Sequence, residues 1–324
     1  MKLIIQIPCY NEEETLPQVI NDLPDELPEV DEVEYLVIDD GSTDRTAEIA
    51  KNIGVHHVIC LGMNRGYGKA FLTGMQKCID LGADIIVNTD GDNQYKGDCV
   101  QDLIKPILTK NADIVIGIRP IDQIKEFSWI KKKLQRIGSL ITRQFSGTDV
   151  PDATSGFRAY SADAAMRLHI MSQYSHSLET IIQAGHMNMH ISNVPVGVNP
   201  KLRESRLMKS TLHYIWNSAF IILNSYVRYK PMRIFSYFAL VPGFIGFLIG
   251  FRFLIYFIVA ENPRGGTQSL ILAAILIIIA FNLFALGIVA HLTGANRNLI
   301  QEVLYLTRTQ KKPETKNLQD KNHQ

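Results

Sequence analysis

The chain has 324 residues, enough for one large domain and an additional segment. Its 33 Lys and Arg residues balance 32 Asp and Glu residues, so the formal net charge of +1 gives no general attraction for nucleic acid. The four cysteines lack Cys-x-x-Cys spacing, which excludes a zinc ribbon of paired thiolates and favours a reducing compartment. We expect no cleavable signal peptide, because the first apolar run ends at Pro8 and is followed by acids.

Short apolar runs alternate with amphipathic segments over the first 200 residues. We expect strands at residues 2–8, 34–39, 55–61, 84–90 and 113–117. Helices are expected at residues 13–22, 43–52, 67–81, 99–109 and 130–145. This alternation is typical of an α/β fold, in which helices flank a mainly parallel sheet on both faces.

Polar segments follow the first four predicted strands. They are residues 8–12, 39–44, 62–69 and 90–94. In open parallel sheets, ligands bind outside the carboxyl ends of the strands. The sequence therefore predicts one site, formed by these four segments at one edge of the sheet.

Two carboxylates in the last of these segments predict a metal site. Asp90 and Asp92 flank a glycine, and their charges would repel each other at the strand end without a cation. Mg²⁺ or Mn²⁺ binds oxygen ligands and commonly shares them with substrate phosphates. For Asp44 we expect instead a capping role at the start of the next helix.

Four short motifs occur in order along the first hundred residues. They are Pro8-Cys9-Tyr10-Asn11-Glu12-Glu13, Val37-Ile38-Asp39-Asp40-Gly41-Ser42-Thr43-Asp44, Asn64-Arg65-Gly66-Tyr67-Gly68-Lys69-Ala70 and Asp90-Gly91-Asp92-Asn93-Gln94. Together they resemble the signature of family 2 glycosyltransferases with the GT-A fold, and the resemblance covers residues 1–210. The segment Asp152-Ala153-Thr154-Ser155-Gly156-Phe157-Arg158 further resembles dolichyl-phosphate mannosyltransferases and bacterial polyprenyl-phosphate glycosyltransferases. That branch often carries C-terminal membrane helices.

The resemblance implies a donor site for a nucleotide sugar. Pro8, Tyr10 and Glu12 would line the base, and Asp39 would bond the base or the ribose. Asp90 and Asp92 would hold Mg²⁺ or Mn²⁺ on the diphosphate, with Asp92 also assigned to catalysis. The residues expected to bind the nucleotide sugar are Pro8, Tyr10, Glu12, Asp39, Asp40, Lys69 and Asp90.

The resemblance also implies a site for an acceptor phosphate. Arg119 and Arg136 match positions that bind this phosphate and would take part in catalysis. Ser155 and Arg158 lie in the acceptor segment, and a structural ion pair is the alternative role of Arg158. Three further positions have open roles: Glu179, Arg203 and Arg206.

The implied reaction is metal-dependent, inverting transfer of a single sugar from GDP-mannose or a UDP-hexose to undecaprenyl or dolichyl phosphate. A phosphate monoester carries a charge of about −1.5 to −2 at pH 7, so it needs no general base. Transfer to a hydroxyl of a glycolipid or lipid-linked oligosaccharide is the alternative, with Asp152 or Glu179 as base. A processive polysaccharide synthase and an inactive membrane scaffold are further alternatives. The donor sugar and nucleotide stay open.

Two apolar stretches, residues 234–260 and 269–292, predict membrane spans. Each is longer than the ~20 residues that cross ~30 Å of hydrocarbon, although a pair of buried core helices is the alternative. Lys and Arg on their outer flanks predict that both termini lie in the cytoplasm. Gly246 and Gly250 have a spacing that would suit packing against a second copy.

The predicted organisation therefore has five parts. Residues 1–206 form a cytosolic GT-A domain, the two spans follow, and residues 293–324 form a cytosolic tail. Residues 207–233 show helical periodicity with a basic edge, which predicts a helix lying in the headgroup layer. A core helix of the cytosolic domain is the alternative for that segment.

Overall fold

The computed structural model describes residues 1–120, 129–170, 176–200, 229–259 and 266–311, and also residues 220, 224 and 227. Within these ranges, the side chains of 129–137 and 311 lie outside the description. The chain divides into two units, Met1–Ile222 with Glu302–Gln324, and Leu223–Gln301. Most of the predicted headgroup-layer helix at 207–233 lies outside the described residues.

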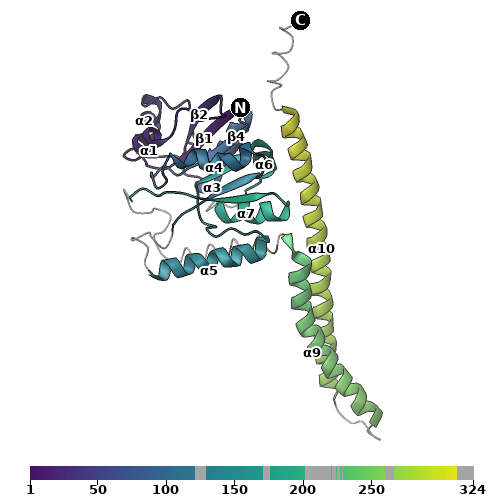
Figure 1. Ribbon diagram of the computed structural model, residues 1–324. Helices are drawn as coiled ribbons and strands as arrows, with labels where there is room; N and C mark the ends of the chain where they lie inside the picture. The colour runs from purple at the N-terminus through teal and green to yellow at the C-terminus, as the bar shows by residue number, and fades with distance from the viewer. Residues whose placement is uncertain are drawn as a thin grey trace. The chain divides into compact units, whose positions relative to one another are not determined.

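A seven-stranded sheet forms the centre of the first unit, in the order β3-β2-β1-β4-β6-β5-β7 (Figure 1). The pairs β1–β2, β1–β4, β2–β3 and β5–β7 are parallel, whereas β6 runs antiparallel to β4 and β5. The strands are β1 (Lys2–Cys9), β2 (Glu32–Asp39), β3 (His57–Cys60), β4 (Ile85–Asn88), β5 (Ile114–Ile118), β6 (Arg158–Ser161) and β7 (Ile191–Pro195).

Helices cover both faces of this sheet. Successive side chains of a strand point to opposite faces, and β1 accordingly places Ile4 in one buried apolar cluster and Leu3, Ile5 and Ile7 in the other. The first cluster includes residues of α3, α6 and α7, and the second includes residues of α1 and α4. The helices are α1 (Leu16–Asp22), α2 (Thr46–Asn52), α3 (Tyr67–Asp80), α4 (Cys99–Leu108), α5 (Trp129–Ser146), α6 (Ala162–Arg167) and α7 (Ser177–His186).

The predicted α/β fold with a mainly parallel sheet is confirmed, and every predicted strand and helix is present. The prediction missed α6, α7 and the strands β6 and β7. Helices α1 and α2 begin at Leu16 and Thr46, each three residues later than expected. The residues before them form hydrogen bonds between two loops at the candidate site instead of entering a helix.

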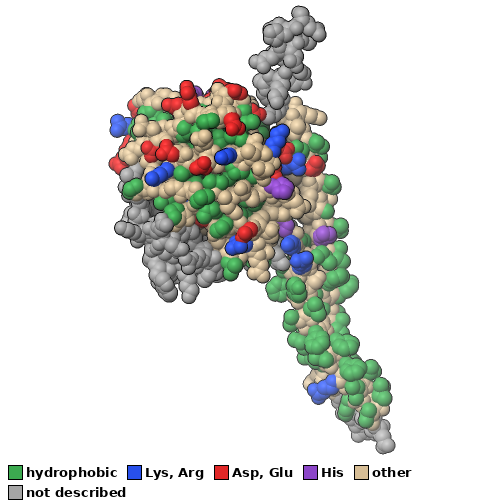
Figure 2. All heavy atoms as spheres, in the orientation of Figure 1, with side chains coloured by type: hydrophobic (Ala, Val, Ile, Leu, Met, Phe, Trp, Pro, Cys, Tyr) green, Lys and Arg blue, Asp and Glu red, His purple; other side chains and the backbone are tan. Residues whose placement is uncertain are grey.

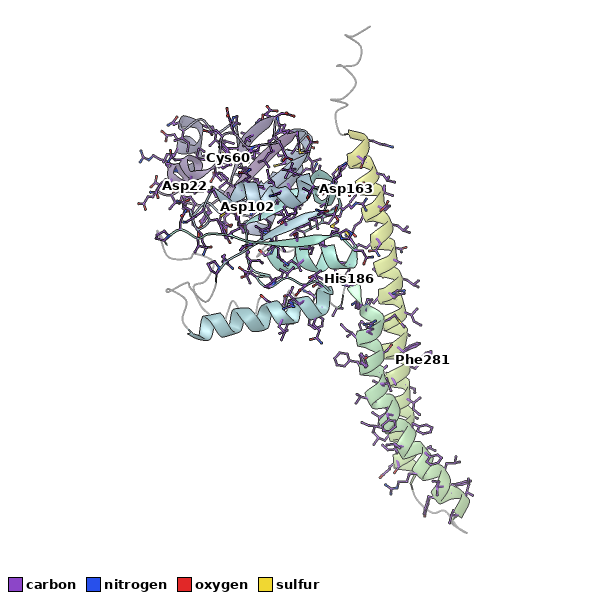
Figure 3. The ribbon with its side chains drawn as sticks, viewed as in Figure 1. Asp22, Cys60, Asp102, Asp163, His186 and Phe281 are labelled. Carbon is purple, nitrogen blue, oxygen red and sulfur yellow. The ribbon has the colours of Figure 1, made fainter. Side chains whose placement is uncertain are left out.

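Two long apolar helices form the second unit, α9 (Pro231–Val259) and the part of α10 (Thr267–Lys311) up to Gln301. Both are long and apolar enough to cross a membrane. Apolar side chains cover them on the face shown in Figure 2, and Phe281, labelled in Figure 3, is 70% exposed. The helix α10 continues past the predicted span end at Leu292, so the predicted tail begins as helix.

Candidate active site

Hydrogen bonds join the loops that follow β1 and β2. The backbone N–H of Asn11 donates to Ser42 Oγ (2.8 Å), and the N–H of Thr43 donates to Asn11 Oδ1 (2.7 Å). Asn11 has a φ of 57°, in the left-handed region that asparagine tolerates better than most residues. These contacts bring together the polar segments 8–12 and 39–44, as the strand ends predicted.

The two carboxylates at the end of β2, Asp39 and Asp40, make different contacts. Asp40 is buried and accepts the backbone N–H groups of Arg65 (2.8 Å) and Gly66 (2.9 Å), just before α3. Burial raises the pKa of Asp40, although these hydrogen bonds favour its charged form. Asp39 is 5% exposed and accepts the N–H of Ser42 (3.1 Å). Asp40 therefore holds the glycine-containing loop, a task that the sequence did not indicate.

A buried hydroxyl connects the first loop to the segment after β4. Thr15 Oγ1 lies 2.8 Å from Glu12 Oε2 and 2.7 Å from the carbonyl oxygen of Gly91. Glu12 is thereby held beside the predicted metal carboxylates. The remaining predicted donor-site residues are Pro8 on β1, the exposed Tyr10 and the exposed Lys69 in the first turn of α3.

The predicted metal carboxylates lie directly after β4. The hydroxyl of Tyr67 donates to Asp90 Oδ1 (2.5 Å). Burial and the negative charge of Asp92 raise the pKa of Asp90, against the influence of Tyr67 and Arg119. No group of three or more His, Cys, Asp or Glu side chains suited to a metal occurs among the described residues. Two crowded carboxylates fit an oxygen-preferring cation that takes its other ligands from a phosphate.

The predicted acceptor segment passes beside Asp90. A Cβ atom added at Gly156 would lie 2.8 Å from Asp90 Oδ2 and 2.9 Å from Oδ1. The backbone of Gly156 is fixed on both sides, since its N–H donates to Tyr95 Oη (3.0 Å) and its carbonyl accepts from Asn88 Nδ2 (2.8 Å). The predicted metal carboxylate Asp90 and the predicted acceptor segment therefore lie side by side.

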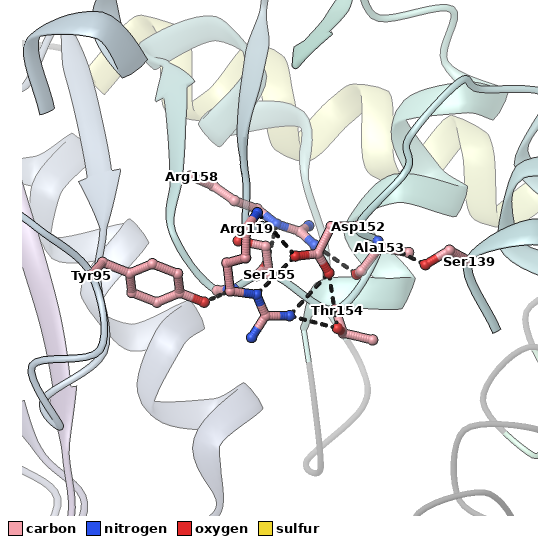
Figure 4. Close-up of polar contacts among 9 residues, drawn as sticks. Tyr95, Arg119, Ser139, Asp152, Ala153, Thr154, Ser155 and Arg158 are labelled. Carbon is pink, nitrogen blue, oxygen red and sulfur yellow. Dashed lines mark hydrogen bonds and ion pairs between the residues drawn. The ribbon is translucent and has the colours of Figure 1, made fainter. Parts of the chain in front are cut away.

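Arg119 and Asp152 form a bidentate ion pair in this site (Figure 4). Nε of Arg119 lies 2.8 Å from Asp152 Oδ2, and Nη2 lies 2.9 Å from Oδ1. Nη2 also donates to Thr154 Oγ1 (2.8 Å). Asp152 is fully buried and Arg119 is 8% exposed, so the pair is shielded from water. A carboxylate held in this way is a poor general base, which weighs against the alternative role predicted for Asp152.

Arg158 and Ser155 are fully buried, which disfavours their predicted contact with an acceptor phosphate. Within the described part of the chain, Arg158 has no acidic partner, so the alternative of an ion pair is also not seen. Its guanidinium donates to four acceptors: the carbonyls of Ser155 (2.8 Å), Ala153 (2.9 Å) and Ser177 (2.9 Å), and Thr180 Oγ1 (2.6 Å). Arg158 thus ties the acceptor segment to the start of α7.

The other predicted residues divide between the interior and the undescribed part of the chain. Glu179 lies in the first turn of α7 and is 2% exposed. Arg136 belongs to α5, but its side chain lies outside the described residues, as do Arg203 and Arg206.

A buried histidine packs behind the site and was not singled out by the sequence. His176 stacks on Phe71 with ring centroids 3.8 Å apart and planes 8° apart. Burial, and secondarily the charge of Arg158, lower the pKa of His176 well below its usual value. The native protein therefore keeps this imidazole neutral.

We expect His176→Phe to flatten the pH dependence of stability. The imidazole stays neutral in the native state but binds a proton in the unfolded chain below pH ~6.5. The free energy of unfolding of wild type therefore falls by about 2 kcal/mol between pH 6.5 and 5 because of this group. Unfolding temperatures at pH 7.5, 6 and 5 measure the difference. His190→Gln, at an exposed position, is the control. Parallel curves for wild type and His176→Phe would show that the imidazole is not excluded from protonation.

Comparisons with known proteins identify the family of this chain. Residues 4–168 match the family model described as "Glycosyl transferase family 2". The undecaprenyl-phosphate mannosyltransferase of Micrococcus luteus is 30% identical, over 64% of this chain and 88% of that protein. The UDP-N-acetylglucosamine–dolichyl-phosphate N-acetylglucosaminyltransferase of Methanococcus voltae is 34% identical, over 59% of this chain and 82% of that protein.

The fold is shared with a solved structure, glucosyl-3-phosphoglycerate synthase from Mycobacterium tuberculosis in complex with Mn²⁺, UDP and glucosyl-3-phosphoglycerate. The TM-score is 0.55 at 20% sequence identity, and the match covers 70% of this chain and 78% of that one. This likeness concerns the GT-A-like sheet and its flanking helices.

Proposed function

This chain belongs to glycosyl transferase family 2, and we propose that it transfers a single sugar from a nucleotide sugar to a polyprenyl phosphate, with inversion at the sugar. The observation that carries the proposal is the position of Asp90, which lies against Gly156 of the segment whose Asp152 pairs with Arg119. Relatives named for undecaprenyl and dolichyl phosphates support this class of acceptor.

On the donor side, Asp90 and Asp92 would hold Mg²⁺ or Mn²⁺. When bound there, the cation would offset the charge that develops on the departing diphosphate. The complex of the mycobacterial synthase with Mn²⁺ and UDP supports a divalent ion. We assign contacts with the nucleotide to Pro8, Tyr10, Glu12, Asp39 and Lys69, whereas Asp40 acts by holding the loop before α3.

On the acceptor side, Arg119 would bind the lipid phosphate. Its Nε and Nη2 are engaged by Asp152 and Thr154, and Figure 4 shows Nη1 pointing away from that carboxylate. A guanidinium fixed on one edge presents its remaining N–H groups in a set direction, which suits a phosphate oxygen. Arg136 remains our second candidate, while Arg158 and Ser155 are assigned to holding the segment.

A lipid phosphate suits this site better than a hydroxyl acceptor. A hydroxyl needs a base to remove its proton, and Asp152 is buried in the pair with Arg119. The phosphate monoester is already anionic and needs only positioning. An in-line attack by a phosphate oxygen on the anomeric carbon would break the bond to the diphosphate and give a β-linked lipid-phosphate sugar.

The two apolar helices would keep the active site at the membrane, where the polyprenyl chain is held. We propose that both helices cross the bilayer with the catalytic unit and both termini in the cytoplasm. The Lys and Arg residues on the outer flanks of the spans support this orientation.

Replacing Arg119 by lysine should affect the acceptor more than the donor. Lysine keeps the positive charge but loses the planar pair with Asp152, so the KM for lipid phosphate should rise about tenfold, with little change for the nucleotide sugar. Steady-state kinetics with each substrate varied in turn measure the two constants. Arg167→Lys, in an exposed pair with Asp163, is the matched control. A larger change for the nucleotide sugar would move Arg119 to the donor site.

The function itself is tested with a panel of radiolabelled donors. Membranes containing the full chain receive GDP-mannose, UDP-glucose or UDP-N-acetylglucosamine, with undecaprenyl or dolichyl phosphate. We expect one donor to place label in the organic phase, dependent on Mg²⁺ or Mn²⁺. Absence of lipid-bound label with every donor and both lipids would contradict the proposal.

A further inference from the structure

The hydroxyl of Tyr67 connects the metal carboxylate Asp90 to the interior of the sheet. Tyr67 is the first residue of α3, and its hydroxyl donates to Asp90 Oδ1 (2.5 Å). Nδ2 of Asn88 donates to the same hydroxyl oxygen (3.3 Å), and Nε2 of Gln6 donates to Asn88 Oδ1 (3.0 Å). Gln6 and Asn88 are fully buried partners on the adjacent strands β1 and β4.

The hydrogen bonds from Asn88 to Tyr67 and from Tyr67 to Asp90 run in one direction, from donor to acceptor. The carbonyl of Gly156 can only accept, so its bond to Asn88 (2.8 Å) requires the amide nitrogen of Asn88 on that side. The same nitrogen then faces Tyr67, whose oxygen accepts and whose proton is directed to Asp90. The bond to Asp90 is therefore set by groups buried behind it and not by Tyr67 alone.

Packing also fixes the ring of Tyr67. It lies against His176, with ring centroids 5.1 Å apart, and His176 stacks on Phe71 in the next turn of α3. At Gly74, further along the same helix, an added Cβ would lie 2.3 Å from Gln6 Oε1. The helix that carries Tyr67 is therefore seated closely on the strand that carries Gln6.

We propose that Tyr67 is a positioning residue for the cation. By holding Oδ1 of Asp90, it would leave Oδ2 to bind, together with Asp92, the ion on the donor diphosphate. The inference rests on the proposed function, which supplies the ion and the diphosphate. Partners that orient metal ligands in this way commonly change metal affinity by about 10- to 100-fold when they are removed.

The test measures binding of Mn²⁺ without sugar transfer. The full chain in lipid nanodiscs is titrated with Mn²⁺ in the presence of UDP or GDP, and free Mn²⁺ is followed by electron paramagnetic resonance. Tyr67→Phe removes the hydroxyl and keeps the ring, so we expect Mn²⁺ affinity to fall about tenfold or more. Tyr35→Phe is the matched control, because the buried Tyr35 also donates to a carboxylate, Oδ1 of the exposed Asp25 (2.8 Å), which is not among the residues assigned to the site.

A second variant covers the case in which Tyr67→Phe does not fold, as judged by its unfolding temperature. Asn88→Ala removes the donor that orients the hydroxyl but retains Tyr67, and a loss of about threefold in Mn²⁺ affinity is expected. If Tyr67→Phe folds and binds Mn²⁺ with wild-type affinity, the inference is overturned. If Tyr67→Phe does not fold, wild-type affinity in Asn88→Ala overturns it. Either result would leave the proposed function intact. Failure of wild type to bind Mn²⁺ with either nucleotide would overturn the proposed metal site and this inference together.

Discussion

Replacing Asp92 by alanine is expected to reduce sugar transfer by about 10³-fold at saturating Mg²⁺ or Mn²⁺. Asp92 is one of the two carboxylates that we assign to the metal, so its loss leaves the cation with one of its two predicted protein ligands. The folded state should lose little stability, because the side chain is partly exposed and its removal relieves repulsion with Asp90.

Transfer rates and the unfolding temperature of the purified variant measure the two effects. Asp98→Ala is the matched control, since this exposed carboxylate precedes α4 and makes no capping hydrogen bond there. We expect the control to transfer sugar at the wild-type rate. Near-normal transfer by Asp92→Ala in the presence of Mg²⁺ would remove the metal assignment.

Adding one methyl group at Gly156 is expected to reduce turnover about 100-fold while the protein stays folded. The new Cβ would lie within 3 Å of both oxygens of Asp90, and a carboxylate at the end of a side chain can rotate away more easily than the backbone can move. The displaced carboxylate would lose its alignment with the cation, and errors of about 1 Å in a catalytic site commonly cost about 100-fold in rate.

Gly138→Ala is the matched control for this substitution. An added Cβ at Gly138 meets no atom within 4 Å, and the residue lies within α5, where alanine is favoured over glycine by about 1 kcal/mol. Turnover and unfolding temperature should therefore stay at or above the wild-type values. Full activity of Gly156→Ala would show that the position of Asp90 is not critical for the reaction.

The edge of the sheet that carries the site could be predicted from the sequence because it depends on local patterns. Apolar runs located β1, β2 and β4, and the polar residues after each run had to meet where parallel strands end. The spacing of Asp90 and Asp92 at the end of a strand predicts a metal site, and that assignment stays a prediction. The contacts between Asn11 and the residues after β2 are consistent with that reasoning.

The roles of individual side chains depended on contacts that local patterns do not encode. Asp40 accepts two backbone N–H groups from a loop 25 residues later, and the loop conformation decides this. Arg158 has a charge that favours the surface, yet it is buried among carbonyl groups. The bond between Tyr67 and Asp90 joins residues 23 positions apart.

Strand β6 and the starts of α1 and α2 were not predicted correctly, because they also depend on contacts that local patterns do not encode. Strand β6 has four residues, from Arg158 to Ser161, and it inserts antiparallel between β4 and β5. Strand β4 is as short but reads Ile-Ile-Val-Asn, whereas β6 reads Arg-Ala-Tyr-Ser, which gives too weak an apolar run to predict a strand. The late starts of α1 and α2 arise because Asn11 and Thr43 bond to each other's loops, which competes with the first turn of a helix.

A comparison of two matched acceptors tests the central claim most directly. The full chain in lipid receives its preferred labelled nucleotide sugar with either a polyprenyl phosphate or the polyprenol of the same chain length. We predict label on the phosphate alone, and about tenfold less of it when Arg119 is replaced by lysine at limiting acceptor. Label on the free alcohol, with none on the phosphate, would contradict the account.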